Sequence, residues 1–242
     1  MVRPAPIVRR LPTILRVDRR VAVERHLVET FGPISGRAGV TFLGAEPVDV
    51  LRFGPHPDGF YRYATIGMSA EPMSDPTAPV RDPAGPRAEL VLSLRAPRDS
   101  VARRLAVLAA IPAIEGIQVV AGAGLDLGEP LWDGARFHSV LVGEPGGLVP
   151  DLPDLPDLAD LPDLADLPDL ADLTAAGRDG QNGQTTGTGT APDSPVRFLP
   201  LFPMTPNESA FKRVHGAAAL RERWLADGLD LRDPVRREAR LG

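Results

Sequence analysis

The chain has 242 residues, of which 43% are hydrophobic, 24% are charged and 5% are aromatic, and its formal net charge is −5. This length and apolar content suffice for one well-packed domain whose core rests on Val, Leu, Ile and Ala. The lack of cysteine excludes disulfides, thiolate metal sites and a cysteine nucleophile, and the scattering of arginines among acids argues against a nucleic-acid partner.

The N-terminal region is predicted to be a flexible segment, residues 1–14, followed by a helix. Asp18 is the predicted N-cap, the helix runs to Phe31, and Gly32 ends it. The first twenty residues are basic but contain no apolar run of signal-peptide length, and no stretch of the sequence reaches the roughly 18 apolar residues of a membrane span. We therefore expect a cytoplasmic protein that does not bind membranes.

Between this helix and residue 145 the sequence predicts several strands and one further helix. The helix is predicted to start at a cap formed by Asp99 or Ser100 and to run through Ile111. The other predicted elements are the strands 46–53, 61–69, 89–94, 117–120 and 137–142, and a Pro- and Asp-rich loop over residues 73–87.

Residues 151–173 form a triplet repeat of Asp-Leu followed by Pro or Ala, which holds eight aspartates. A period of three fits neither an α-helix nor a strand, and recurrent proline excludes a continuous helix. The Gly- and Thr-rich stretch that follows cannot bury enough apolar area to offset the cost of ordering it. We predict one low-complexity, disordered insert over residues 146–194; the alternative is an acidic–hydrophobic binding arm.

The sequence after the insert predicts a strand over residues 197–202 and then two helices. Thr205 and Glu208 can form a capping box, and Pro206 lies at the first helical position, where a missing N–H costs nothing. This helix is predicted to end near His215-Gly216. A second helix is predicted over residues 217–227, with Leu220, Trp224 and Leu225 facing inward.

The order of these elements predicts an α+β fold rather than repeated βαβ units. We expect a mixed sheet flanked by helices, in a single domain that is interrupted by the long disordered insert. The domain is predicted to consist of residues 15–145 and 195–240.

Candidate catalytic and metal-binding residues are few. The four histidines form no metal-binding pair, so no metal site is predicted. Gly122-Ala123-Gly124 is a weak dinucleotide signal because no helix opens cleanly after it, so a turn before a strand is favoured and no cofactor is predicted. A hydrolase or transferase would need a histidine and an acid to converge on Ser69. Otherwise the acids are expected to be solvated loop residues: Glu71, Asp75, Glu89 and Asp126.

Several motifs resemble those of the suppressor-of-fused domain family. The clearest are YATIGMS, residues 63–69, and RAELVLSL, residues 87–94, which resemble a Gly-Met-Ser strand of the family and the Glu-Leu strand that follows it. Further similar segments, in family order, are residues 124–132, 137–145, 196–211, 215–225 and 229–234. The chain is most similar to the bacterial single-domain type.

This resemblance implies a mixed α/β domain without a catalytic apparatus. The animal member of the family holds transcription factors by pairing with an extended peptide, and the role implied for bacterial single-domain relatives is that of immunity proteins in polymorphic toxin systems. The chain is therefore expected to bind a protein partner, either a toxin or a regulatory protein, and to have no enzymatic activity.

The predicted binding residues come from this resemblance and from one loop. Tyr63 and an acid after its motif, Glu71 or Asp75, correspond by resemblance to the peptide site of the family, although Tyr63 also fits a core position. Trp132 is either a core residue, which we favour, or part of a binding surface. Residues 61–69 are expected at an edge or rim of the sheet, where a peptide can extend it.

Overall fold

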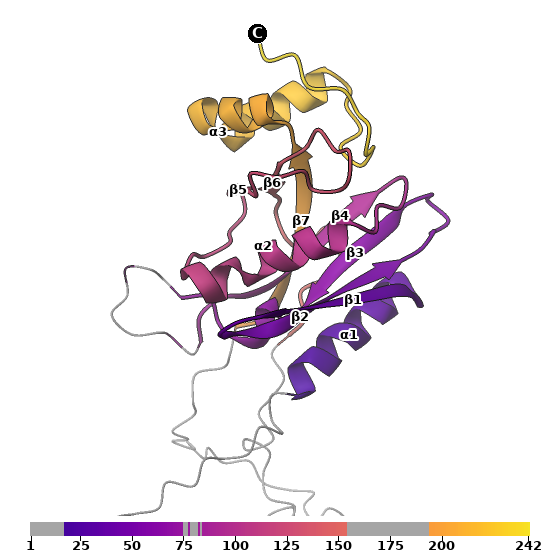
Figure 1. Ribbon diagram of the computed structural model, residues 1–242, viewed down its shortest axis with the longest axis vertical. Helices are drawn as coiled ribbons and strands as arrows, with labels where there is room; N and C mark the ends of the chain where they lie inside the picture. The colour runs from indigo at the N-terminus through magenta and orange to yellow at the C-terminus, as the bar shows by residue number, and fades with distance from the viewer. Residues whose placement is uncertain (1–16, 75–76, 78–81, 83, 154–193) are drawn as a thin grey trace, which may run out of the picture.

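The computed structural model describes residues 17–74, 77, 82, 84–153 and 194–242. These residues form a seven-stranded mixed sheet with three α-helices (Figure 1), which confirms the predicted α+β class. In chain order the elements are α1 (Val17–Phe31), β1 (Ile34–Phe42), β2 (Ala45–Phe53), β3 (Tyr61–Ile66), a 3₁₀ turn (Met68–Ala70), β4 (Arg87–Leu94), α2 (Val101–Glu115), β5 (Gly124–Asp126), β6 (Ser139–Val142), β7 (Val196–Met204) and α3 (Pro206–Ala226).

The strand order of the sheet is β1-β2-β3-β4-β7-β6-β5. The first four strands pair antiparallel in sequence, and β7 then enters between β4, to which it is parallel, and β6, to which it is antiparallel. Because β7 follows the Asp-Leu repeat in the sequence, the segments on either side of that repeat share one sheet. The strands differ in burial, and β4 is buried along nearly its whole length.

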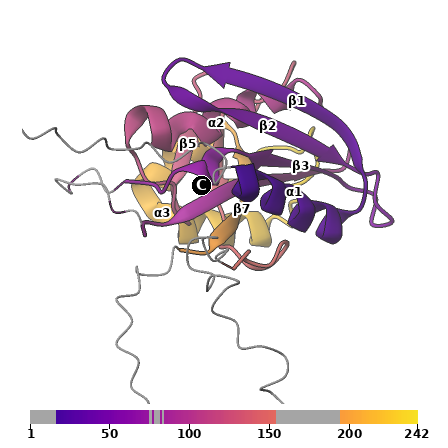
Figure 2. The same cartoon turned by 90° about the horizontal axis from the view of Figure 1, so that it is seen from below.

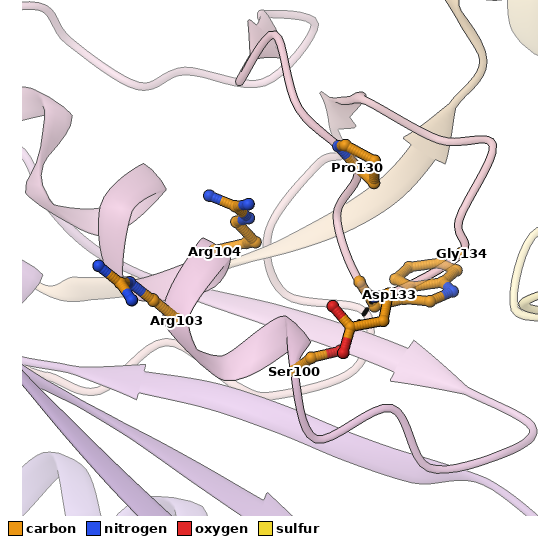
Figure 3. Close-up of a pocket in the computed structure, with 7 residues that line it drawn as sticks. Ser100, Arg103, Arg104, Pro130, Asp133 and Gly134 are labelled. Atoms are coloured by element: carbon orange, nitrogen blue, oxygen red, sulfur yellow. Dashed lines mark hydrogen bonds between the residues drawn. The ribbon is translucent and has the colours of Figure 1, made fainter.

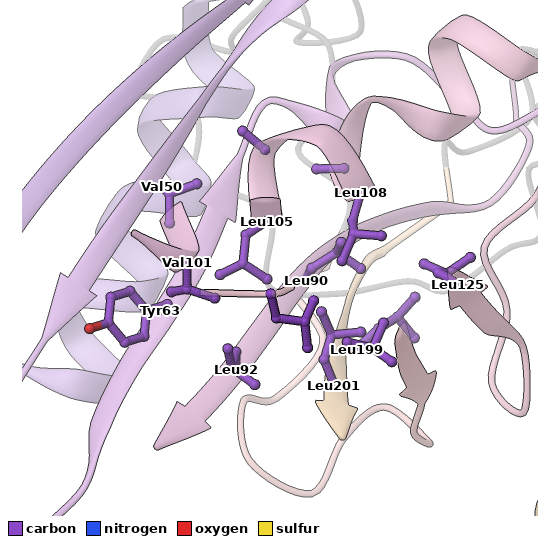
Figure 4. Close-up of a cluster of buried hydrophobic side chains, with 14 of the residues drawn as sticks. Val50, Tyr63, Leu90, Leu92, Val101, Leu105, Leu108, Leu125, Leu199 and Leu201 are labelled. Atoms are coloured by element: carbon purple, nitrogen blue, oxygen red, sulfur yellow. The ribbon is translucent and has the colours of Figure 1, made fainter. Parts of the chain in front are cut away.

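Helices α1 and α2 cover opposite faces of the sheet (Figures 1 and 2). Side chains along β2 point alternately to the two faces of the sheet. Val48 and Val50 pack in the hydrophobic cluster with α2, whereas Leu51 and Phe53 pack in the cluster with α1. Figure 4 shows the α2 layer, whose labelled side chains are mostly leucines from α2, β4 and β7. This layer is mainly aliphatic, in keeping with the low aromatic content of the sequence, although Tyr63, Trp132 and Phe137 are also buried in it.

Helix α3 builds a third cluster beyond the end of the sheet, around Leu220 and Trp224. The predicted capping box is present, with Glu208 N–H donating to Thr205 and Thr205 N–H donating to Glu208. The helix is broken at Gly216, where φ is 87° and ψ is 167°, so the predicted boundary between two helices is confirmed. The inward placement of Leu225 was wrong, because its side chain is 80% exposed.

Three other local predictions were wrong. Strand β1 was not predicted, because its two glycines weaken the apolar alternation. Residues 117–120 are not a strand: Ile117 and Val120 point into solvent, and the next strand is β5. Neither Asp99 nor Ser100 caps α2 with its side chain, because both make contacts with other parts of the fold.

The first residues of the predicted disordered insert belong to the fold: Val149 is buried in the α1 cluster, and Leu152 lies beside Val196, where the chain returns to the sheet. The backbone groups of Leu152 and Val196 exchange two hydrogen bonds of 2.9 Å in an antiparallel bridge. His26 on α1 stacks on Phe198 of β7, and its Nε2 lies 2.8 Å from the carbonyl oxygen of Pro150. Most of the predicted insert, residues 154–193, lies outside the described residues.

No helix in the described ranges is long and apolar enough to cross a membrane. No group of three or more His, Asp or Glu side chains in these same ranges is arranged to hold a metal ion.

Candidate protein-binding surface around helix α2

Three of the predicted binding residues line surface hollows beside α2. Trp132 lies at its N-terminal end, Tyr63 lies between its first turn and the β1–β2 hairpin, and Glu71 lies near its C-terminal half. Asp75 lies outside the described residues. The fold therefore gathers around one helix residues that are up to 69 positions apart in the sequence.

The tryptophan hollow has a volume of about 490 Å³ and is lined by Ser100, Arg103, Arg104, Pro130, Trp132, Asp133 and Gly134. Figure 3 shows the two arginines on α2 and the loop that carries Asp133, whose backbone N–H donates to Ser100 Oγ at 3.0 Å. Trp132 is only 3% exposed and packs on Phe137 with ring centroids 5.5 Å apart. Trp132 thus forms a buried wall of this hollow, in keeping with the favoured core position.

The tyrosine hollow is smaller, about 200 Å³, and is lined by Gly36, Arg37, Ala38, Val50, Arg52, Tyr63, Asp99 and Ala102. The hydroxyl of Tyr63 accepts a hydrogen bond of 2.8 Å from the N–H of Arg98 and donates one of 3.3 Å to Asp99. Arg52 holds the same carboxylate at 2.6 and 2.8 Å. These bonds fix the start of α2 against the sheet.

The ring of Tyr63 is 1% exposed, and Figure 4 shows it at the margin of the leucine cluster with its hydroxyl pointing away from the leucines. Burial raises the pKa of this hydroxyl to about 12, so it stays protonated and able to donate at neutral pH. Tyr63 therefore serves the core, and its binding role remains a prediction. The expected sheet edge at residues 61–69 was wrong, because β3 is paired on both sides, with β2 and β4.

The glutamate hollow is the largest of the three, at about 550 Å³. It is lined by Gly44, Ala45, Glu46, Val48, Gly67, Met68, Ala70, Glu71, Ala109, Ala110 and Ala113. Alanines on α2 and glycines in two turns leave this space, because larger side chains there would fill it. The only charged groups in the lining are the two glutamates.

Three large apolar residues that are close in sequence to lining residues of the glutamate hollow have exposed side chains. Leu43, next to Gly44, is fully exposed, and Ile114, next to Ala113, is 56% exposed. Ile117 follows α2 and is 45% exposed. Apolar side chains that gather around a concavity are typical of protein-binding surfaces. The sequence did not predict this feature, because residues 117–120 were predicted to form a short strand.

A buried carboxylate shapes the turn that borders the glutamate hollow. Glu89 on β4 is fully buried and accepts hydrogen bonds from the hydroxyls of Thr65 and Ser69, both at 2.6 Å. It also accepts from the backbone N–H groups of Gly67 and Ser69 at 2.9 and 3.0 Å. The Thr-x-Gly-x-Ser and Glu-Leu motifs are thus one hydrogen-bonded unit, and the prediction that Glu89 is a solvated loop acid was wrong.

The same network bears on the hydrolase alternative. Ser69 is buried, and its hydroxyl donates a hydrogen bond to the Glu89 carboxylate rather than to an imidazole. A serine nucleophile needs a base that can also return the proton to a leaving group, and an approach for the substrate. No observation at Ser69 therefore favours the hydrolase alternative.

Comparison with known proteins gives one family. A family model described as Suppressor of fused protein (SUFU) matches residues 44–237. A suppressor of fused homologue from Neisseria gonorrhoeae has a similar structure, with a TM-score of 0.59 and 17% identity over 92% of this chain and 97% of that one. No curated protein sequence matches.

Two further solved structures share the fold. The structure of the Sufu–Fu complex matches with a TM-score of 0.55 and 12% identity, over 91% of each chain. Drosophila Suppressor of Fused matches with a TM-score of 0.56 and 12% identity over 91% of this chain, which spans 51% of that protein.

Proposed function

The chain belongs to the suppressor of fused protein family, and from that premise we propose that it is a non-catalytic module that captures a protein partner. The observation that carries this proposal is the glutamate hollow with the exposed apolar side chains beside it. The similar Sufu–Fu structure is that of a protein complex, which supports this kind of function.

The proposed contact area consists of the glutamate hollow together with Leu43, Ile114 and Ile117. Burying such apolar side chains against a partner contributes about 25 cal/mol per Å² of area removed from water. The lining of the hollow is apolar apart from Glu46 and Glu71, so the partner segment that fits is one that presents apolar side chains. Tyr63 and Trp132 act in this scheme by holding α2 in place rather than by contacting the partner.

Two kinds of partner are consistent with the family: a toxin that the chain neutralises as an immunity protein, and a regulatory protein that it sequesters in the cytoplasm. Both roles need stoichiometric capture and no activated group. Expression of the neighbouring gene alone and together with this chain separates them. Growth arrest that the chain relieves identifies a toxin, whereas normal growth in both cultures excludes a toxin encoded by that gene.

The test of partner capture is an affinity purification from the native host with tagged wild type and two variants. Ile114→Arg places a bulky cation in the apolar surface beside the hollow, and we expect it to weaken capture at least about tenfold, as for a central interface residue. Leu225→Arg is the matched control, because Leu225, like Ile114, is an exposed aliphatic residue of a helix but lies on α3. Equal retention of every bound protein by the two variants would refute the proposed surface.

A further inference from the structure

Strand β1 forms one edge of the sheet, and the other edge strand, β5, has only three residues. In the part of the chain that the structure describes, no strand pairs with the outer side of β1. Figure 2 shows β1 along the margin of the sheet. An edge strand of this kind presents unpaired N–H and C=O groups that can pair with another strand.

Strand β1 has only some of the usual protections of an edge strand: its pairing with β2 is irregular near both ends, but the segment between them is regular. Its sequence, ISGRAGVTF, contains no proline or lysine. Its one charged residue, Arg37, is held by the carboxylates of Glu24 and Asp49. Helix α1 packs against β3, and α2 packs more on β2 than on β1, so neither helix is centred over this edge.

The pairing of β1 with β2 is regular from Gly36 to Val40 and irregular on either side. This regular segment is centred on Ala38. A two-fold axis at Ala38 would therefore align the regular segments of two copies along their whole length. It would place Gly36 opposite Val40 of the second copy, and Arg37 opposite Gly39 rather than opposite another arginine, so no like charges would face each other directly.

We propose that two copies of this chain pair antiparallel through β1 about a two-fold axis at Ala38, which joins their sheets into one. The contact is isologous, so it closes at two copies and leaves no further edge of this kind. Its surface is separate from the glutamate hollow, and its test is independent of partner capture.

Ala38→Cys tests the axis directly, because the chain has no other cysteine. Residues directly opposite in antiparallel strands have Cβ atoms about 4.5–5.5 Å apart, close to the 3.5–4.5 Å that a disulfide spans. We expect mild oxidation to convert most of this variant to a covalent dimer on a denaturing gel. Leu43→Cys is the control, because two such residues would lie roughly 33 Å apart. Equal cross-linking of both variants, or none in Ala38→Cys, overturns the proposal.

Light scattering of the unmodified full chain gives the second readout. We expect a mass twice the 25.8 kDa of one chain. Ala38→Lys sets two ammonium groups opposite each other at the axis, and the tyrosine hollow, which Ala38 lines, has room for the added side chain. We expect this variant to be monomeric, with an unchanged circular dichroism spectrum. A wild type that is monomeric at about 100 μM, or a folded Ala38→Lys that remains dimeric, contradicts the assignment.

Discussion

At the scale of single residues, the buried pair of Glu208 and Arg236 ties the C-terminal segment to the rest of the fold. The guanidinium donates to both carboxylate oxygens at 2.7 Å. Trp224 Nε1 and the backbone N–H groups of Thr205 and Ala239 complete the shell at 2.9–3.0 Å. Burial raises the pKa of Glu208, but the arginine and the backbone donors outweigh it, and the pKa lies below its ordinary value.

Glu208→Gln should destabilise the protein by about 3–5 kcal/mol, because it leaves the charge of Arg236 buried and unpaired. The stabilisation by the carboxylate is fully present above the unfolded-state pKa of about 4.3 and is lost as the pH falls through the lower folded-state value. Urea unfolding at pH 7 and in steps down to pH 3 measures this. The gap between wild type and variant should shrink as the pH falls; a constant gap would contradict the ionised pair.

The matched control for this pair is the double variant Glu208→Gln with Arg236→Met. Replacing both partners removes the buried charge, so part of the lost stability should return, with little dependence on pH below 5. If the double variant were less stable than either single one, packing around Trp224 rather than charge pairing would govern this site.

At the scale of elements, the turn after β3 sets the shape of the glutamate hollow. Gly67 has a φ of +124°, and a Cβ at this position would lie 2.5 Å from the carbonyl oxygen of Pro47 and from Nη1 of Arg20. Only glycine allows the chain to approach β2 so closely and still present its N–H to Glu89.

Gly67→Ala should therefore lower the free energy of unfolding by clearly more than about 1–2 kcal/mol, which is the cost of a left-handed backbone conformation alone. Gly32→Ala is the matched control, because Gly32 also has a positive φ, +80°, and no atom lies within 4 Å of its added Cβ. Chemical denaturation of both variants separates the cost of the steric overlap of the added Cβ from the cost of the positive φ. Equal losses of stability would show that the turn moves away from β2 without cost.

Local sequence signals predicted the elements whose causes are local. The capping box at Thr205 and the stop at Gly32 each need only neighbouring residues, and both were confirmed. Helix α2 starts after Ser100, as predicted, but the side-chain contacts of Asp99 and Ser100 and the nature of residues 117–120 depend on tertiary structure. Asp99 pairs with Arg52, which is 47 positions away, so its capping potential is used elsewhere. No pattern in the sequence around residue 99 reveals that partner.

At the scale of the whole molecule, the described residues close the fold without residues 154–193, and the first leucine of the Asp-Leu repeat, Leu152, takes part in that closure. The bridge between Leu152 and Val196 holds the two ends of residues 153–195 together, and β7 completes the sheet directly after it. A chain in which residues 154–193 are replaced by two glycines should therefore unfold at nearly the same temperature as the wild type, because shortening a loop lowers the cost of closing it.

Differential scanning calorimetry of the full chain and of the shortened chain measures this. The same pair of proteins tests the binding-arm alternative, because equal capture of the partner by both chains excludes a role for the repeat. A drop of more than about 10 °C in the unfolding temperature would mean that the repeat contributes to the core.

The fold class and the family could be predicted from sequence, because apolar periodicity and the Gly-Met-Ser and Glu-Leu motifs lie in short segments. The candidate surface could be predicted only in part. Glu71 was singled out, but Leu43 and Ile114 become neighbours of one hollow only after β1, β2 and α2 have packed. Likewise, the edge position of β1 follows from the order of all seven strands.

The central position of β7 has a practical consequence for engineering. The two neighbours of β7 in the sheet, β4 and β6, both precede it in the sequence. The backbone that joins them to β7 runs through residues 153–195. Cleavage of the chain there would give two fragments, each of which lacks some strands of the sheet. The complete sheet would form only when the two fragments associate. The protein thus offers a natural breakpoint for a two-piece reporter, in which restored structure signals that two fused proteins have come together.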